Sequence, residues 1–316
     1  MAEPFADLAD IYLRRAARPS LLGVAEDRAD GTAPVVVAQR LRRGSCGSPR
    51  GAKPLVTDAL KTTRALSRAK VLVRADSAFY GRGLVGAAVR AGADVSVTVR
   101  MDPKVKAAIT TIADDAWQTI EYTDAVFDEA TGRWISRAEV AEIDFTAFAG
   151  QKTTDRVPGR LVVRRIPDLN PRSTDGQETL FDTWRFHSFF TTTDPSVLGT
   201  VAADKTHRGH AVIEQVHADL KSSALAHLPS GKFAANAAWL VLAVMAFNLT
   251  RIAATLTGPD LAKATTATIR RKLITVPAWI ASSARRVTLH LPTAWPWEAA
   301  WTRMFNGCGP PTAAPS

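Results

Sequence analysis

Two carboxylates occupy positions where a metal-dependent reaction could take place. Asp76 directly follows Val71–Ala75, a short apolar run typical of a strand that is buried on both faces. In parallel α/β folds, functional groups gather at the carboxyl ends of strands, so a carboxylate at this point is well placed to bind Mg²⁺. The alternative is structural, because an aspartate there also suits the N-cap of a following helix.

The second carboxylate, Glu214, lies in the polar run HRGHAVIEQVHADLK, residues 207–221. On a single helix, one face would carry five ionisable side chains: His207, His210, Glu214, His217 and Lys221. Three of the 6 histidines of the chain would then share that face. This concentration favours a functional face over an ordinary solvated one.

Other metal sites fit the sequence less well. Glu214 and His217 form a Glu-x-x-His pair of the kind found in di-iron bundles, but we find no second pair. His210 and Glu214 could contribute to a zinc site, yet the HExxH signature is absent. Cys46 and Cys308 are too few for a Cys-based zinc site or a disulfide framework, and they suit a reducing cytoplasm.

Basic residues surround these carboxylates. Arg208 and Lys221 flank Glu214 and suit phosphate contact beside a metal, while Arg42 and Arg43 belong to an arginine-rich turn that could contact a DNA backbone. The net charge of +10 and the pI near 10.0 indicate a polyanionic partner, namely nucleic acid, anionic lipid or acidic protein. For each basic cluster, the alternative is a solvated surface.

Alternating strands and helices predict the α/β core that would position these residues. Strands expected at 34–41, 70–75 and 94–99 alternate with helices at 54–66 and 83–91, which predicts a parallel sheet with right-handed crossovers. Residues 102–116 are expected to be helical, and 117–193 to be β-rich, with a hairpin at 125–136 and strands at 160–166 and 186–192. Helices are expected at 207–220, 233–256 and 263–274, and a strand at 286–291. Residues 1–33 predict only a short helix near 5–15.

One apolar segment resembles a membrane span. Ala234–Leu249 is shorter than the roughly 20 residues that a bilayer requires, and Asn236 and Asn248 interrupt it. We therefore expect a buried core helix. The N-terminus shows no signal peptide pattern, so a cytoplasmic protein without a membrane partner is expected.

Two long segments resemble bacterial insertion-sequence transposases with a DDE domain of the group 1 type. VLVRADSAFYGRGLVGAAVRAGADVSVTVRMDP (71–103) is similar to the region around their second catalytic aspartate. HRGHAVIEQVHADLKSSALAHLPSGKFAANAAWLVLAVMAFNLTR (207–251) is similar to the region of their catalytic glutamate, and RLRRGSCGSPRGAKPLVTDAL (40–60) looks like their strand and first helix. The resemblance covers about residues 34–305.

The resemblance implies a ribonuclease-H-like α/β fold, with a β-rich insertion before the last catalytic helix. An Asp, an Asp and a Glu would hold two divalent ions, Mg²⁺ or Mn²⁺, for DNA strand cleavage and transfer. Asp76 and Glu214 would be the second and third of these catalytic metal ligands. Five residues would bind double-stranded DNA at transposon ends: Arg208, Lys221, His210, Arg42 and Arg43. The resemblance also admits a homodimer.

The first catalytic aspartate has no counterpart in this reading. Asp10 follows a helical pattern, and Asp27 and Asp30 lie in a polar stretch. We therefore expect a divergent remnant at 1–33, a transposase core at 34–305 whose first strand or strands are missing, a tail at 306–316, and defective catalysis. The alternatives are a non-catalytic DNA-binding remnant and a structural or interaction protein, which a salt-dependent DNA affinity would distinguish.

Overall fold

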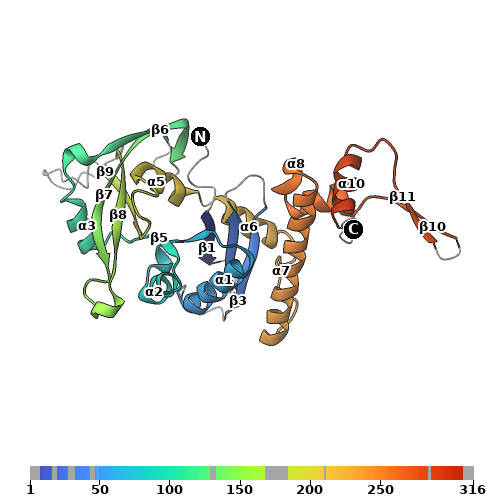
Figure 1. The fold of residues 1–316 in the computed structure, drawn as a ribbon, viewed down its shortest axis with the longest axis horizontal. Coiled ribbons are helices and arrows are strands. Elements are labelled where there is room, and N and C mark those ends of the chain that lie inside the picture. Colours follow the sequence, from blue (N-terminus) through green and yellow to red (C-terminus); the bar gives the residue numbers. More distant parts are fainter. Residues whose placement is uncertain are drawn as a thin grey trace, which may run out of the picture.

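A computed structural model of the chain describes residues 8–15, 20–27, 33–42, 47, 49–128, 133–167, 184–209, 211–283 and 286–308. For residues 8–15, 20–23, 25–27, 121–128, 133–137 and 211 it describes the backbone only. The molecule is elongated, with a central α/β part between a β-rich part and a smaller C-terminal part (Figure 1).

The described elements follow one another in three groups. The central part contains β1 Leu8–Arg15, β2 Ser20–Asp27, β3 Val35–Leu41, α1 Ala52–Leu66, β4 Lys70–Ala75, η1 Ser77–Phe79, α2 Arg82–Arg90 and β5 Asp94–Thr98. The β-rich part contains α3 Pro103–Ile109, η2 Asp114–Ala116, β6 Gln118–Asp128, β7 Arg133–Ala147, η3 Thr153–Asp155, β8 Val157–Pro167 and β9 Trp184–Thr191. Then follow α5 Thr200–Arg208, α6 Ala211–Lys221, α7 Phe233–Leu256, α8 Pro259–Ala262, α9 Thr266–Ile269, a π-helical turn Arg270–Ile274, β10 Trp279–Ser283, β11 Arg286–His290 and α10 Glu298–Gly307.

One mixed sheet runs through the central and β-rich parts in the order β3-β2-β1-β4-β5-β9-β8-β7-β6. β1 is antiparallel to β2 and parallel to β4, which is parallel to β5. β9 joins β5 in the antiparallel direction and leads into the antiparallel β-rich part. The three strands that the sequence predicted to be parallel, β3, β4 and β5, run in the same direction, whereas β2 and β9 run the opposite way and make the sheet mixed. The α/β class is confirmed.

The predicted absence of the first strand is wrong. Residues 8–15, for which we expected a helix, form β1 in the interior of the sheet between β2 and β4, and residues 20–27 form β2. The segment LADIYLRR allows both readings by pattern. The sheet decides between them, because β1 fills the position between β2 and β4 and exchanges backbone hydrogen bonds with both.

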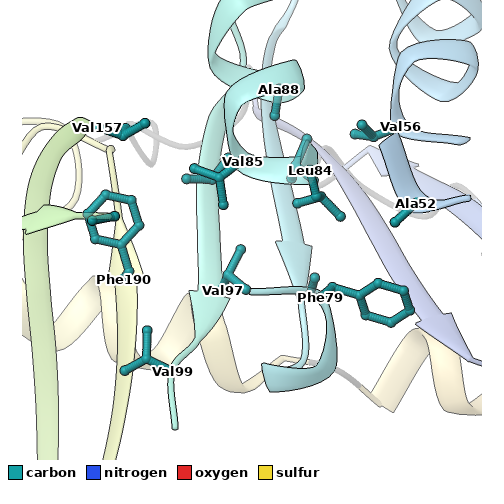
Figure 2. Packing of buried hydrophobic residues seen from close by; sticks show 14 of the residues in the cluster. Ala52, Val56, Phe79, Leu84, Val85, Ala88, Val97, Val99, Val157 and Phe190 are labelled. Carbon is teal, nitrogen blue, oxygen red and sulfur yellow. The ribbon is translucent and has the colours of Figure 1, made fainter. Parts of the chain in front are cut away.

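The main core lies on one face of the central strands. Val71, Val73 and Ala75 of β4 point to this side and pack against α1 and α2 in a cluster of buried apolar residues. Phe79, Leu84, Val97 and other members interdigitate there, and Phe190 joins them from the β-rich part (Figure 2). Burial of each such side chain contributes about 1.5–3 kcal/mol. This core therefore fixes β4 and the residue that follows it.

Several elements agree with prediction. The strands expected at 34–41, 70–75, 94–99, 160–166, 186–192 and 286–291 are present within a few residues, as are the helices at 54–66, 83–91 and 233–256. β6 and β7 pair as the predicted hairpin, whose turn lies outside the described residues. Gly92 has φ 72° and ends α2, as expected of a C-terminal glycine. The helix expected at 263–274 is divided into α9 and the π-helical turn.

α7 differs from the buried core helix that we predicted. It has 24 residues, and by length and composition alone it could cross a membrane, although core helices of other proteins pass the same test. One side packs on β3 and α6 through Leu240, Val244 and Phe247. Only 33% of its most apolar window is buried, so a second side is open.

Candidate metal and DNA site

Asp76 lies at the carboxyl end of β4, as the sequence predicted. Its Oδ1 accepts a hydrogen bond of 2.8 Å from the Ala78 amide and caps η1, so the structural role that we considered is present. The residue is nevertheless exposed, and its backbone is extended with φ −75° and ψ 173°. The cap does not prevent the exposed carboxylate from binding a cation.

Arg74, two residues before Asp76, joins β4 to the segment between α5 and α6. Its side chain points away from the α1–α2 core and is 2% exposed. Nη1 donates to the Thr206 carbonyl, and a Cβ at Gly209 would lie 3.2 Å from the same atom. The α5–α6 junction therefore lies against the strand that ends at Asp76.

His207 fixes the same junction to β5. Its ring nitrogens hydrogen-bond with the hydroxyls of Ser96 (Nδ1–Oγ, 2.8 Å) and Thr98 (Nε2–Oγ1, 2.9 Å). The ring stacks on Phe189 of β9 with centroids 4.0 Å apart and planes at 4°. His207 is buried, so it serves as a structural link rather than as part of an open ionisable face.

The single helix that we predicted for 207–220 is wrong. α5 ends at Arg208, Gly209 adopts φ −68° and ψ 44°, and α6 begins at Ala211. The five polar residues therefore do not share one helical face. Glu214 and Lys221 are exposed on α6, His217 is buried, and His210 lies outside the described residues.

A buried polar cluster holds the helix that carries Glu214. Asp219 of α6 accepts hydrogen bonds of 2.8 Å from both the backbone amide and the hydroxyl of Thr266. Arg251 of α7 lies 3.7 Å from Asp219 and donates to the Ala264 carbonyl. Burial lowers the pKa of Arg251, and the nearby Asp219 carboxylate opposes that shift. α6 is thus fixed at its carboxyl half to α7 and α9.

The register of β1 places Asp10 away from the level of Asp76. Asp10 pairs with Leu72, and Leu13 pairs with Ala75, so position 14 is the one level with Asp76. Four residues along a strand span about 13 Å. Position 14 is an arginine. Asp27 pairs with Ala9, still farther from this level, and Asp30 lies outside the described residues.

The described donors do not form a complete metal site. Within the part of the chain that the structure describes, no three His, Cys, Asp or Glu residues are grouped so that they could hold one ion. Asp76 and Glu214 offer two carboxylates, whereas two divalent ions bound as the sequence resemblance implies require three. The donor set as described does not fit that pair of ions, so we derive no reaction step through them.

The predicted DNA contacts differ in their surroundings. Lys221 is exposed at the end of α6, and Arg208 is partly exposed and bonded to the buried carboxylate of Asp204 at 2.8 Å. Arg42 is 6% exposed and donates to the carbonyls of Gly47 and Arg50. Arg43 lies outside the described residues. Arg42 therefore shapes its own turn, while Lys221 and Arg208 remain accessible.

A cleft of about 370 Å³ begins next to Asp76. Ser77, Tyr80, Arg100 and Asp102 line it together with Pro49 and Ala78. Burial, and secondarily the Asp102 carboxylate, raise the pKa of Tyr80 to about 12. The cleft thus combines a cation, an anion and neutral hydroxyls beside the exposed carboxylate.

Comparison with known families decides the affiliation of this chain. The family described as transposase DDE domain group 1 matches residues 30–307, which is most of the chain. The chain belongs to this transposase family. The resemblance seen in the sequence is thereby confirmed, and membership in the DDE transposases implies DNA as the partner and, for the family in general, divalent metal ions. No curated protein matches the chain.

Sequence reasoning missed the residues that assemble this transposase domain around Asp76. Arg74 carried a signal, since an arginine inside the apolar run of a buried strand needs a partner. Ser96 and Thr98 could have been found from their alternation with Val95 and Val97. Asp219 gave no signal, because its partners come from α7 and α9.

Proposed function

We propose that this transposase domain has a ribonuclease-H-like core in which Asp76 and Glu214 are two of three metal-binding carboxylates. The single observation that carries this proposal is the attachment of the α5–α6 junction to β4 and β5 by Arg74 and His207. That attachment brings the start of the Glu214 helix toward the strand that ends at Asp76. The strand order β3-β2-β1-β4-β5, with β2 alone antiparallel to its neighbours on both sides, also supports the core assignment.

The chemistry proposed for the family site is Mg²⁺- or Mn²⁺-dependent cleavage and transfer of DNA strands during transposition. A site that holds two divalent metal ions would activate the attacking oxygen and stabilise the leaving oxygen of a phosphodiester. In this chain Asp76 and Glu214 would bind the metal. Lys221 and Arg208 would hold DNA phosphates, and His210 and Arg43 would extend that surface.

We propose further that this copy is defective in cleavage. The register of β1 supports this, because Asp10 is four residues short of the level of Asp76 and an arginine occupies the matching position. A cation at position 14 opposes metal binding, whereas a carboxylate would complete it. The sequence suggested the same defect from a missing strand, and the register now supplies a different reason.

We also propose the domain limits expected from the sequence, with one change. The β-rich stretch at about 117–193 would be an insertion within the core, and 205–305 its C-terminal helical part. β1 and β2 belong to the same sheet as the rest of the core, so the remnant proposed at 1–33 is not separate from it. A cytoplasmic location, without a membrane partner, accords with DNA as the substrate.

The alternative is a DNA-binding remnant without catalytic function, which the same register favours. A nicking assay on supercoiled plasmid with Mg²⁺ or Mn²⁺, using wild type, Asp76→Ala and Glu214→Ala, tests the proposed defect. DNA binding that weakens steeply with salt, without nicking by any of the three, supports a chain that binds DNA and does not cleave it, as the defective transposase and the remnant both require. Nicking by the wild type that both substitutions abolish would refute the defect. Absence of DNA binding would refute both the defective transposase and the DNA-binding remnant.

A further inference from the structure

The β10–β11 hairpin projects from the C-terminal part as a ribbon whose two faces are both exposed. Trp279–Ser283 and Arg286–His290 pair with each other, and within the described part of the chain neither strand joins another sheet. Figure 1 shows the ribbon beyond α10, on the other side of α7 from the central sheet. An isolated two-stranded hairpin is only marginally stable in water, so a partner that covers the ribbon would stabilise it.

The base of the ribbon is packed against the rest of the C-terminal part. Leu273, which precedes β10, belongs to a buried apolar cluster with Ala254 of α7 and Ala300 of α10. The Nζ of Lys272 lies 3.6 Å from the ring centroid of Trp297, which follows β11. The chain therefore enters and leaves the ribbon through residues that are held in place, and the exposed strands extend from a fixed base.

The two faces of the ribbon differ in chemistry, because residues directly opposite each other in an antiparallel pair point to the same face. By the register, the first face carries the pairs Trp279–His290, Ala281–Thr288 and Ser283–Arg286, and the second face carries Ile280–Leu289 and Ser282–Val287. The first face thus combines a guanidinium, an imidazole, an indole and two hydroxyls, whereas the second is mainly aliphatic. Arginine, serine and threonine are side chains that bond to DNA phosphates and to base edges, so the first face has the chemistry of a DNA contact.

The dimensions of the ribbon fit the major groove of duplex DNA. Its two strands lie about 4.8 Å apart, and five residues of a strand span about 17 Å. The major groove, about 12 Å wide, admits a two-stranded β-ribbon with its side chains, whereas the minor groove is only about 6 Å wide. The ribbon is therefore narrow enough to enter the wider groove.

The charge of the surrounding segment favours the same partner. Residues 261–308 contain seven basic residues and one acidic residue, a net charge of +6 out of +10 for the whole chain. Arg270 and Arg271, before the ribbon, and Arg286, on its first face, are all exposed. DNA phosphates would neutralise this charge. DNA would also use the hydroxyls of the first face, which a lipid surface would not.

We infer that the β10–β11 ribbon is a second DNA-binding element, which lies in the major groove with its first face toward the bases while Arg270 and Arg271 contact phosphates at its base. The inference rests on the proposed function in that duplex DNA is the partner, but it does not depend on the metal site. Because the ribbon lies on the other side of α7 from the central sheet, it would hold DNA away from the reacting phosphate (Figure 1).

Fluorescence anisotropy of a labelled mixed-sequence DNA duplex measures the contribution of the ribbon in the full-length protein. The ribbon variant Arg286→Gln/Thr288→Val removes a charge and a hydroxyl from the first face and keeps the shape of the strand. Its dissociation constant should rise about tenfold, and the slope of log affinity against log salt should fall by about 0.9. The matched control Val287→Thr/Lys152→Gln makes the isosteric change on the second face and removes one exposed charge from the β-rich part, and it should bind like the wild type. Equal affinities of the ribbon variant and the control would overturn the inference.

A duplex whose cytosines carry glucosylated 5-hydroxymethyl groups tests the groove, because the sugars fill the major groove. This duplex should bind the wild type at least about fivefold more weakly than the plain duplex and should make little difference to the ribbon variant. Equal wild-type affinity for the two duplexes, or wild-type binding to anionic vesicles that Ile280→Ser/Val287→Ser abolishes, would overturn the inference.

Arg208→Gln/Lys221→Gln separates the ribbon from the DNA contacts proposed beside Glu214. DNA binding that this change weakens, and that the ribbon variant leaves intact, would overturn the inference and leave the proposed function standing. The opposite result would support the ribbon and count against the proposed contacts of Arg208 and Lys221.

Discussion

Replacement of Asp219 by asparagine tests how the Glu214 helix is held. The carboxylate accepts two hydrogen bonds of 2.8 Å from Thr266, and it is the counter-charge of Arg251, 3.7 Å away; both side chains of the pair are at least 94% buried. Asparagine keeps the shape and removes the charge, so Arg251 stays buried without a counter-ion. Removal of one partner from such a pair typically costs about 3–5 kcal/mol. Because 3.7 Å is long for an ion pair, we expect the lower part of this range, about 3 kcal/mol.

Urea unfolding followed by circular dichroism measures the loss as a change in midpoint at constant slope. Thr266→Val is the matched control, because it removes only the hydroxyl from the same cluster and should cost about 1 kcal/mol. The double variant Asp219→Asn/Arg251→Met should recover part of the stability by removing the uncompensated charge. A loss below about 1 kcal/mol for Asp219→Asn would refute the cluster as an anchor of α6.

Three further predictions concern the contacts between strands and the cleft beside Asp76. His207→Phe keeps the stacking on Phe189 but leaves the Ser96 and Thr98 hydroxyls without this partner. It should lower the free energy of unfolding, measured in urea, by about 2–4 kcal/mol. Adding Ser96→Ala to this variant should recover part of that loss. Gly159→Ala places a Cβ 2.5 Å from the Thr191 carbonyl and should destabilise the protein by about 1–3 kcal/mol. Gly199→Ala, with open space around it, is the control and should differ little from wild type. Equal urea midpoints for the two variants would contradict the packing around Gly159. Tyr80, with a pKa raised to about 12, should ionise late in a spectrophotometric titration, and Tyr80→Phe should remove that late step. Since the folded pKa exceeds the ordinary value near 10, the stability from neutral Tyr80 should be intact below pH 10 and decline toward pH 12, whereas the variant should lack this decline.

The central part of the fold could be predicted because its elements carry local signals. The apolar run of β4 and the apolar spacing of α1 and α2 each indicate one type of element, and Asp76 follows β4 directly. β1 could not be predicted, because LADIYLRR has no clear period and forms a strand only between two partners. The break at Gly209 was equally hidden, since the contacts of Arg74 and His207 with β4 and β5 impose it.

The candidate site was likewise predictable only in part. The two carboxylates and their order in the chain were visible in the sequence, as was the family. Their supports were not, because Arg74, His207 and Asp219 each act through residues far away in the chain. The open side of α7 was also missed, since a run of apolar residues does not reveal how many of its faces have a partner.

Binding of Mn²⁺ followed by electron paramagnetic resonance tests the central claim, that this transposase domain has an incomplete carboxylate site. Wild type is compared with Arg14→Asp, which places a carboxylate level with Asp76 in the register of β1 and β4. We predict weak binding by the wild type and at least about tenfold tighter binding by Arg14→Asp, with the gain lost when Asp76→Ala or Glu214→Ala is added. Tight binding by the wild type that either alanine substitution abolishes would mean that the site is already complete, and it would contradict the account.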